Sequence, residues 1–382
     1  MPLTIGLMSG TSLDGIDAAL VEIAEETGAP RLLACHAEPM PAALRERLWA
    51  LCHADEARFA DLAVAEEAFC HLQAEAVAAL LAESGNPRGA VAAIGSHGQT
   101  VEHAPYGHPG GGDAGGPAYT LQLDNPSRLA ELTSIAVVAD FRRRDLAAGG
   151  QAAPLAPAFH QALFRATGQW RLVLNLGGFA NLTLLPPLED PREPLGFDSG
   201  PANALLDAWH ARHRGGAFDA DGAWAASGRV DEVLLARLLE EPFFHRPPPR
   251  STGRELFHLD WLAARLGGEE RPADVQATLA ELTATSVALA VEMARERLEA
   301  PPPGRLIPCG GGAHNRDLLA RLARRLPEAR LADAAEWGWP ADWLEAGAFA
   351  WLAYRRLAGL PGNLPSVTGA AGPRVLGGLY AP

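Results

Sequence analysis

The chain has 382 residues and a formal net charge of −14, with 48% hydrophobic and 20% charged residues. This is the composition of a globular protein of about two domains, and its acidic balance without a basic run argues against a nucleic-acid partner. No apolar run reaches about 18 residues and no basic leader precedes the first apolar segment, so we expect no membrane span, no export and a cytoplasmic location.

Cysteine and lysine usage exclude further classes of site. The four cysteines are scattered and form no C-x-x-C pair, which favours reduced thiols over a disulfide framework or a zinc site. The sequence contains no lysine. A P-loop nucleotide site and Schiff-base catalysis on lysine are therefore excluded.

The predicted elements alternate between strands and helices. A Gly- and Pro-rich loop is expected at 104–118, and the RPPPR stretch at 246–250 is typical of a stiff linker. In chain order the pattern predicts strands at 3–8 and 16–23, two helices within 42–84, strands at 90–98 and 133–141, a strand–turn–strand at 172–186, helices at 201–213, 230–240 and 273–299, a strand ending in a glycine turn at 305–312, and helices at 315–325 and 341–359.

This alternation predicts an α/β architecture. At 3–23 and again at 172–186, a glycine-rich turn lies between two strands, whereas a Rossmann fingerprint needs its glycines to open a helix. The pattern therefore argues against a Rossmann fold.

The first glycine turn, MSGTSLDGID at 8–17, carries small residues, hydroxyls and carboxylates. Such a turn lets backbone N–H groups approach phosphate oxygens closely. A carboxylate beside phosphate makes sense if Mg²⁺ stands between them, through water, with Asp14 as the candidate ligand. A simple hairpin with Asp14-Gly15 at its tip explains the same residues. The candidate ATP-binding residues on this turn are Gly10, Thr11, Ser12, Leu13, Asp14, Gly15, Ile16 and Asp17.

Two further glycine turns follow predicted strands. NLGGFANLT at 175–183 holds Gly177, Gly178 and Asn181, and CGGGAHN at 309–315 holds Gly310, Gly311 and Gly312. Taken singly, the first is explained by a hairpin and the second by a flexible connector. Together the three turns favour a nucleotide held between two lobes, with adenine and ribose over the third.

The GFDSGPAN stretch at 196–203 places Asp198 on a turn that Gly200 and Pro201 stiffen before a helix. Asp198 is then either a helix N-cap or a general base close to phosphate.

Polar residues also follow two other predicted strands. DFRRRDLAAGGQ at 140–151 has three consecutive arginines, at least one of which should point inward towards a carboxylate or a polar substrate. A solvated turn, with local pairing to Asp140 and Asp145, is the alternative. SHGQT at 96–100 places His97 and Gln99 at a strand end, where a structural role for the histidine competes with a binding role.

With these motifs, and with STGRELF at 251–257 and GLPGNLPSVTGA at 359–370, the sequence resembles the anhydro-N-acetylmuramic acid kinase family from near residue 5 to near residue 370. The resemblance implies an actin-like ATPase fold, that of the sugar kinase–heat-shock protein–actin superfamily, with ATP in an inter-lobe cleft. It implies an N-terminal lobe of 1–132 with about 360–382, and a C-terminal lobe of 133–359.

The resemblance also implies the reaction. An ATP- and Mg²⁺-dependent kinase converts 1,6-anhydro-N-acetylmuramic acid and water into N-acetylmuramic acid 6-phosphate during cell-wall recycling, and it acts as a homodimer. Asp198 occupies the position of the family's catalytic aspartate. The candidate sugar contacts are His97, Gln99, Arg142 and Glu345, although Glu345 could equally serve the first turn of its own helix. One departure is Asp124, which stands where the family pattern leads us to expect glycine.

Two rival functions stay open at this point. A kinase for another 1,6-anhydro sugar, such as levoglucosan, would share Asp198 and the ATP motifs but would not need to bind a lactyl carboxylate. A non-catalytic, actin-like ATP-binding protein would need the glycine turns but not Asp198.

Overall fold

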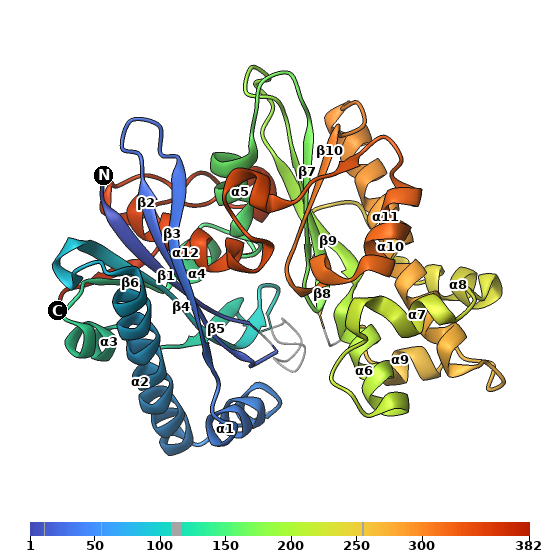
Figure 1. Ribbon diagram of the computed structural model, residues 1–382, viewed down its shortest axis with the longest axis horizontal. Coiled ribbons are helices and arrows are strands. Elements are labelled where there is room, and N and C mark those ends of the chain that lie inside the picture. The colour runs from blue at the N-terminus through green and yellow to red at the C-terminus, as the bar shows by residue number, and fades with distance from the viewer. Residues whose placement is uncertain (11, 55, 108–115, 254–255) are drawn as a thin grey trace. The chain divides into compact units, whose positions relative to one another are not determined.

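The computed structural model describes residues 1–10, 12–54, 56–107, 116–253 and 256–382 (Figure 1). The chain forms two compact units, one of Met1–Leu163 with Trp343–Pro382 and one of Phe164–Asp342. The expected lobe boundaries at 132 and about 360 differ from these. Strand β6 (Val137–Ala139) is part of the first sheet and helix α12 (Leu344–Leu357) packs on that sheet, so the segments 133–163 and 343–359 belong to the first unit.

The first unit is built on a seven-stranded mixed sheet. Strands β1 (Leu3–Ser9), β2 (Gly15–Ile23) and β3 (Pro30–Pro39) form an antiparallel meander. Strand β4 (Val91–Ala104) pairs parallel with β1, and β6 (Val137–Ala139) pairs parallel with β4. Strands β12 (Gly378–Tyr380) and β5 (Tyr119–Leu123) complete the sheet as antiparallel partners of β6 and β4.

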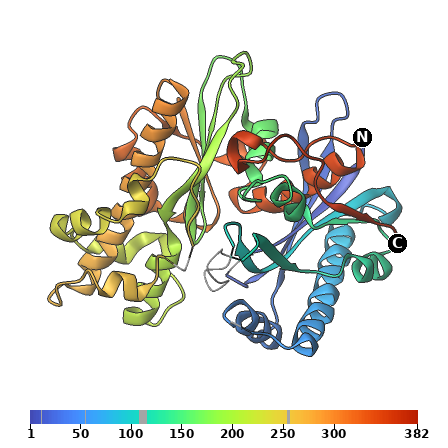
Figure 2. The same ribbon diagram turned by 180° about the vertical axis from the view of Figure 1, so that it is seen from behind.

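Helices cover both faces of this sheet. Ile5 and Leu7 of β1 lie in a core with α1 (Ala42–Cys52) and α2 (Phe59–Ser84). Because side chains alternate along a strand, Gly6 faces the other way. A Cβ on Gly6 would lie 1.8 Å from the Ala346 carbonyl oxygen of α12 (Leu344–Leu357), and its neighbour Gly95 has a similarly close contact. These two glycines allow α12 to lie directly on the sheet (Figure 2).

Short helices fill the rest of the first unit. They are η1 (Arg88–Ala90), α3 (Pro126–Thr133), α4 (Phe141–Leu146), α5 (Ala156–Phe164) and α13 (Pro365–Thr368).

The second unit has a five-stranded sheet of related design. Strands β7 (Arg171–Leu176), β8 (Phe179–Leu185) and β9 (Leu195–Pro201) form an antiparallel meander. Strand β10 (Arg305–Cys309) pairs parallel with β7, and β11 (Arg330–Leu331) pairs parallel with β10.

Helix α10 (Pro272–Leu298) packs on this sheet together with α11 (Arg316–Arg325). By length and composition alone α10 could cross a membrane, but 72% of its most apolar window is buried in the unit, as in the core helix of a soluble protein. The remaining helices are α6 (Asn203–Arg214), η2 (Ala220–Gly222), α7 (Ala223–Ser227), α8 (Glu232–Leu239), η3 (Pro242–His245), α9 (Leu259–Ala263), η4 (Gly311–His314), η5 (Ala334–Trp337) and η6 (Ala341–Trp343).

The two sheets share one strand order. In the first unit it runs β3-β2-β1-β4-β6, and in the second it runs β9-β8-β7-β10-β11, with the same parallel and antiparallel pairings. The β1–β2 turn of one unit therefore corresponds to the β7–β8 turn of the other, and each carries glycine. The predicted α/β class with two lobes is confirmed, and the glycine turns do lie between antiparallel strands.

Five strands were not expected, namely β3, β5, β9, β11 and β12. Strand β3 carries a mixture of apolar and charged residues, and its exposed edge hides the alternation that marks a strand. Strand β9 contains GFDSGPAN, whose glycine and proline suggest a turn, although Leu195–Pro201 forms strand pairs with β8. The predicted loop at 104–118 falls partly on 108–115, outside the described residues.

Candidate functional site

The β1–β2 turn presents an open stretch of backbone in the first unit. A Cβ on Gly10 would meet only the Ser12 hydroxyl, at 3.7 Å, so nothing in the protein's own packing requires glycine there. Ser12 and Asp14 are exposed, while Leu13 adopts a left-handed φ of 58° and is buried. Gly15 differs, because a Cβ there would lie 2.4 Å from the Glu38 carbonyl oxygen of β3. Thr11 lies outside the described residues.

The later part of this predicted ATP-binding stretch lies within strand β2. Ile16 is buried in the core, and Asp17 is partly buried opposite Met8 of β1. The turn itself, at Gly10 to Asp14, is thus the part that is open to a ligand.

In the second unit, the β7–β8 turn is tied to the start of helix α6. The Gly177 carbonyl accepts from the Asn203 N–H at 3.1 Å, and the Gly178 carbonyl accepts from the N–H groups of Ala202 and Ala204 at 3.0 Å each. Because these bonds occupy the N–H groups at the N-terminus of α6, those N–H groups are not available to a phosphate. A Cβ on either glycine would have only ordinary contacts, at 3.7 Å, so the turn itself is open.

The three consecutive glycines after β10 have different surroundings. A Cβ on Gly310 would lie 2.4 Å from Asn175 Oδ1, and one on Gly312 would lie 2.6 Å from the Leu176 side chain. Both glycines are needed because this turn packs against the end of β7. Gly311 has no close neighbour, since its nearest contact would be at 3.9 Å. Gly311 is therefore the open position of the three.

Asp198 belongs to a row of polar residues across three strands. Asn175 of β7 pairs with Asn181 of β8, and Asn181 pairs with Asp198 of β9. Residues paired in this way share a face of the sheet. All three are partly exposed, whereas their neighbours along the strands are mostly buried. Asn175 was not predicted, and the signal that could have indicated it is the placement of one asparagine on each side of the Gly177–Gly178 turn.

The predicted N-cap role of Asp198 is wrong. Helix α6 begins after Ala202, which makes no side-chain cap, and Asp198 lies inside β9. Its Oδ2 accepts a hydrogen bond from the Thr252 N–H at 2.9 Å. Its backbone pairs with Arg250 in both directions, since the Asp198 N–H donates to the Arg250 carbonyl at 3.2 Å and Arg250 Nε donates to the Asp198 carbonyl at 2.9 Å.

Arg250 was not predicted, because it was assigned to a stiff linker. The side chain is only 3% exposed, and its guanidinium lies over the rings of Phe197 and Phe243. Burial lowers the pKa of Arg250 to about 10, and the nearby Asp198 opposes that shift. Arg250 therefore stays charged at neutral pH and fixes the strand segment that carries Asp198.

In the first unit, His97 and Arg142 form one hydrogen-bonded group. His97 Nδ1 donates to the Gly98 carbonyl at 2.7 Å, which leaves Nε2 to accept from Arg142 Nε at 3.1 Å and Nη2 at 2.9 Å. Burial, and then the Arg142 charge, hold the pKa of His97 well below its ordinary value. Both ring nitrogens are thus used within the protein, and the neutral imidazole serves to orient Arg142.

Arg142 is the inward-pointing member of the arginine triplet. Its Nη1 donates to the Ala152 carbonyl at 2.6 Å, and burial lowers its pKa to about 10 while the Glu345 carboxylate acts in the opposite direction. Glu345 lies in the first turn of α12 and is partly buried. Arg143 and Arg144 are exposed and line a separate pocket of about 610 Å³.

Gln99 is also held by its own unit. Its Oε1 accepts from the Ser9 hydroxyl at 2.7 Å, and its Nε2 donates to the Thr100 carbonyl at 3.2 Å. The side chain is fully buried. Gln99 therefore joins the end of β1 to β4, directly before the open turn at Gly10.

Asp124, which stands where the family pattern leads us to expect glycine, lies next to Gly98 of strand β4. Its Cβ would be 3.0 Å from a Cβ placed on Gly98. Burial raises the pKa of Asp124 to about 6, and the nearby Ser96 and Gln73 side chains act in the opposite direction. The residue thus supports β4 from inside the unit.

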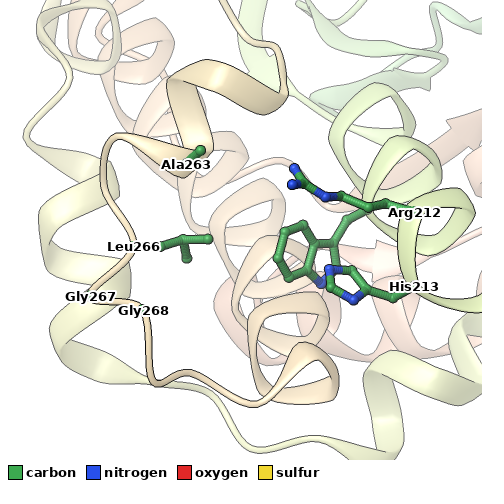
Figure 3. Close-up of a pocket in the computed structure, with 7 residues that line it drawn as sticks. Arg212, His213, Ala263, Leu266, Gly267 and Gly268 are labelled. Carbon is green, nitrogen blue, oxygen red and sulfur yellow. The ribbon is translucent and has the colours of Figure 1, made fainter.

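A second pocket, of about 340 Å³, lies within the second unit (Figure 3). Trp209, Arg212 and His213 of α6 line one side of it, and the segment 263–268 lines the other. None of the predicted site residues borders this pocket.

Among the residues that the structure describes, no group of three or more His, Cys, Asp or Glu side chains is placed to hold a metal ion. Mg²⁺ in kinases is held by one or two carboxylates together with substrate phosphates and water. An exposed Asp14 on an open turn fits that mode, although Arg45 Nη2 lies 3.9 Å from its carboxylate.

The chain is thus an α/β protein of two units with related sheets, open glycine turns in both units and an aspartate in a solvent-facing polar row. A family model described as anhydro-N-acetylmuramic acid kinase matches residues 2–382. The enzyme of that name from Chromohalobacter salexigens is 64% identical over 381 residues, with both chains fully covered. That from Pseudomonas paraeruginosa is 52% identical over 382 residues, which cover 100% of this chain and 99% of the relative. The chain belongs to the anhydro-N-acetylmuramic acid kinase family.

Solved structures are similar at a greater distance. The activator of 2-hydroxyisocaproyl-CoA dehydratase from Clostridium difficile, with bound ADPNP, is 10% identical with a TM-score of 0.46 and coverage of 94% and 96%. A ROK family glucokinase from Streptomyces griseus, in complex with glucose and AMPPNP, is 16% identical with a TM-score of 0.39 and coverage of 92% and 99%. Family membership makes the chain an ATP-dependent phosphotransferase with an alcohol group as acceptor.

Proposed function

We propose that this chain converts 1,6-anhydro-N-acetylmuramic acid, ATP and water into N-acetylmuramic acid 6-phosphate and ADP, as a step of peptidoglycan recycling. The observation that carries the proposal is the position of Asp198. Its carboxylate lies in a solvent-facing row with Asn175 and Asn181, and the Thr252 N–H and Arg250 hold it in place. A base with fixed geometry and access to solvent is what activation of a water molecule requires.

The reaction follows from the substrate's chemistry. An anhydro sugar has no free 6-hydroxyl, so there is no hydroxyl proton for a kinase base to remove. Asp198 instead takes a proton from water as the water oxygen bonds to C1 and the C1–O6 bond breaks. O6 keeps the electron pair of that bond and attacks the γ-phosphorus, and ADP leaves. The open backbone at Gly10, Gly177 and Gly311 would receive the nucleotide, because no side chain limits its approach there.

Mg²⁺ would be held by Asp14 through water, together with the phosphates. When bound, Mg²⁺ would neutralise part of the charge on the phosphates. Asp14 would hold that water from its exposed position on the turn.

Arg142 is the proposed partner of the lactyl carboxylate. A guanidinium has five N–H donors. The bonds to His97 and Ala152 use three of them, which leaves two donors, on Nη1 and Nη2, without a partner among the described residues. Two such donors suit a bidentate contact with a carboxylate. Glu345 near Arg142 is placed to accept from a sugar hydroxyl or amide.

We also propose a cytoplasmic homodimer, on the strength of family membership alone. Sedimentation of the purified protein at micromolar concentration tests this, and a single species of about 40 kDa, the mass of one chain, would contradict it.

The proposed role of Asp198 is tested by Asp198→Asn. The amide oxygen can still accept from the Thr252 N–H, so folding should persist while the base is lost. We expect turnover to fall by about 100- to 10,000-fold. Asp221→Asn is the matched control, because Asp221 is an exposed residue of the same unit and has a positive φ that asparagine tolerates. Near-normal turnover of folded Asp198→Asn would overturn the assignment.

Levoglucosan in competition with the muramic substrate tests specificity. Preference for the muramic sugar supports the proposal, whereas phosphorylation of levoglucosan alone would make the chain a kinase for a different anhydro sugar.

A further inference from the structure

The carboxylate of Asp145 has no direct place in the reaction above, although it is fully buried in the first unit. It belongs to α4, three residues after Arg142. The sequence alone suggested that it pairs with a neighbouring arginine. Its hydrogen bonds instead go to a backbone amide and to two polar side chains.

Those side chains come from a segment more than 200 residues away. Asp145 Oδ1 accepts from Asn363 Nδ2 at 2.6 Å and from the Thr368 hydroxyl at 2.8 Å. Both partners are almost completely buried. The link therefore joins the DFRRRDLAAGGQ stretch, which carries Arg142, to GLPGNLPSVTGA, a motif that the proposed reaction has not used.

The other oxygen of Asp145 holds the backbone that receives Arg142. Asp145 Oδ2 accepts from the Ala152 N–H at 2.8 Å, and the neighbouring Gln151 N–H donates to the Thr368 carbonyl at 2.7 Å. Ala152 has a φ of 60°, a left-handed conformation that a residue with a Cβ adopts only when its surroundings impose it. In that conformation its carbonyl accepts from Arg142 Nη1 at 2.6 Å.

The loop closes tightly around the same carboxylate. The Gly150 N–H donates to the Asp145 carbonyl at 3.0 Å, and a Cβ on Gly150 would lie 2.1 Å from Asp145 Oδ2. Only glycine fits there. Arg142 is therefore held on one side by His97 and on the other by a strained carbonyl that Asp145 and Thr368 keep in place.

We infer that Asp145, Asn363 and Thr368 are positioning residues that aim the guanidinium of Arg142, and so set the preference for a sugar acid over a neutral anhydro sugar. The inference rests on the proposed contact between Arg142 and the lactyl carboxylate. Loosening Ala152 would let the guanidinium move without removing its charge, and a displacement of about 1 Å can cost about 100-fold in a positioned contact.

The experiment compares two ligands by calorimetry on the full-length protein without ATP: 1,6-anhydro-N-acetylmuramic acid, and 1,6-anhydro-N-acetylglucosamine, which lacks the lactyl group. Three variants are used. Thr368→Val removes one hydrogen bond to Asp145 at nearly constant shape, Thr368→Ser keeps the hydroxyl, and Asp145→Asn replaces one acceptor oxygen with a donor. Thermal melts establish that each variant is folded.

We expect Thr368→Val to weaken binding of the muramic sugar about tenfold, with Asp145→Asn weakening it at least as much. Binding of the neutral sugar should change less than twofold, and Thr368→Ser should restore the preference. Equal weakening for both sugars, or no change for either in the folded Thr368→Val protein, would overturn the inference.

Arg142→Ala separates this result from failure of the proposed function. If Arg142→Ala loses the preference and Thr368→Val keeps it, the contact stands and the positioning role is wrong. If Arg142→Ala itself keeps the preference, the contact proposed for Arg142 is wrong, and the positioning role falls with it.

Discussion

Replacement of Arg250 by leucine tests how the second unit holds Asp198. Arg250 is 3% exposed and donates hydrogen bonds to four backbone carbonyls, those of Asp198, Phe243, Phe244 and Arg246, at 2.7–3.0 Å. Leucine fills a similar volume but donates none of these bonds.

Three contributions determine the expected change in stability. Leucine loses the hydrogen bonds and the ring contacts of Arg250, but it also removes the cost of burying a charge. The four carbonyls share three N–H groups, one on Nε and two on Nη1, and three hydrogen bonds to a charged donor are worth about 4.5 kcal/mol at the lower end of their usual range of about 1.5 kcal/mol each. The lowering of the Arg250 pKa from 12.5 to about 10 corresponds to about 3 kcal/mol against the buried charge, which leucine would not suffer. The two ring contacts add about 1 kcal/mol to the loss. We therefore expect Arg250→Leu to lower the free energy of unfolding by about 2.5 kcal/mol.

Calorimetry or circular dichroism of the full chain measures this directly. For a unit of this size, about 2.5 kcal/mol corresponds to a fall in the unfolding temperature of about 5–10 °C. Arg246→Leu is the control, because the Arg246 side chain lies in the same segment but is exposed, and we expect a change within about 0.5 kcal/mol. Equal unfolding temperatures for the two variants would refute the reasoning.

Three further predictions concern stability. Gly6→Ala should destabilise the first unit by more than about 3 kcal/mol in a denaturant melt, since its Cβ would lie 1.8 Å from a carbonyl of α12, whereas Gly89→Ala, with open space around it, should be near neutral. Arg321→Met should cost about 3–5 kcal/mol, because it leaves the buried Glu281 with fewer partners, and an unchanged melt would contradict this. Burial lowers the pKa of His160 to about 3, so below pH 6.5 the unfolded chain binds a proton that the folded one does not, and stability falls as the pH drops from 6.5 towards 3. His160→Gln should reduce the loss between pH 6.5 and 5.5 by about 1 kcal/mol, and an identical pH dependence in both proteins would contradict that assignment.

The sequence predicts most of the sheet and helix pattern because periodicity survives in the long elements. Helices α2 and α10 and strands β1, β4, β7 and β10 lie where apolar spacing puts them. Strand β9 was missed, since its glycine and proline indicate a turn locally while pairing with β8 determines the strand. This tertiary pairing is also why Asp198 is part of a strand and not a helix cap.

The site residues divide in a similar way. Local motifs are enough to propose Arg142 and Asp198 as site residues, because each stands in a dense polar stretch next to a predicted strand. The same motifs do not show that His97 forms hydrogen bonds with Arg142 or that Gln99 forms one with Ser9.

Long-range partners leave even less trace in a single sequence. Asn363 meets Asp145 across 218 positions, and Arg250 holds Asp198 across 52. Both links depend on the completed fold. The sequence also does not distinguish the three consecutive glycines. Only the structure shows that Gly311 is open, whereas packing requires glycine at 310 and 312.

The most direct test of the central claim is mass spectrometry of the product formed in ¹⁸O-water. The purified protein is incubated with ATP, Mg²⁺ and 1,6-anhydro-N-acetylmuramic acid, and a parallel sample contains levoglucosan. The proposed reaction predicts a 6-phosphorylated muramic acid with one ¹⁸O at C1 and none in the O6 bridge. A phosphorylated muramic product without ¹⁸O at C1, or no phosphorylated muramic product at all, would contradict it.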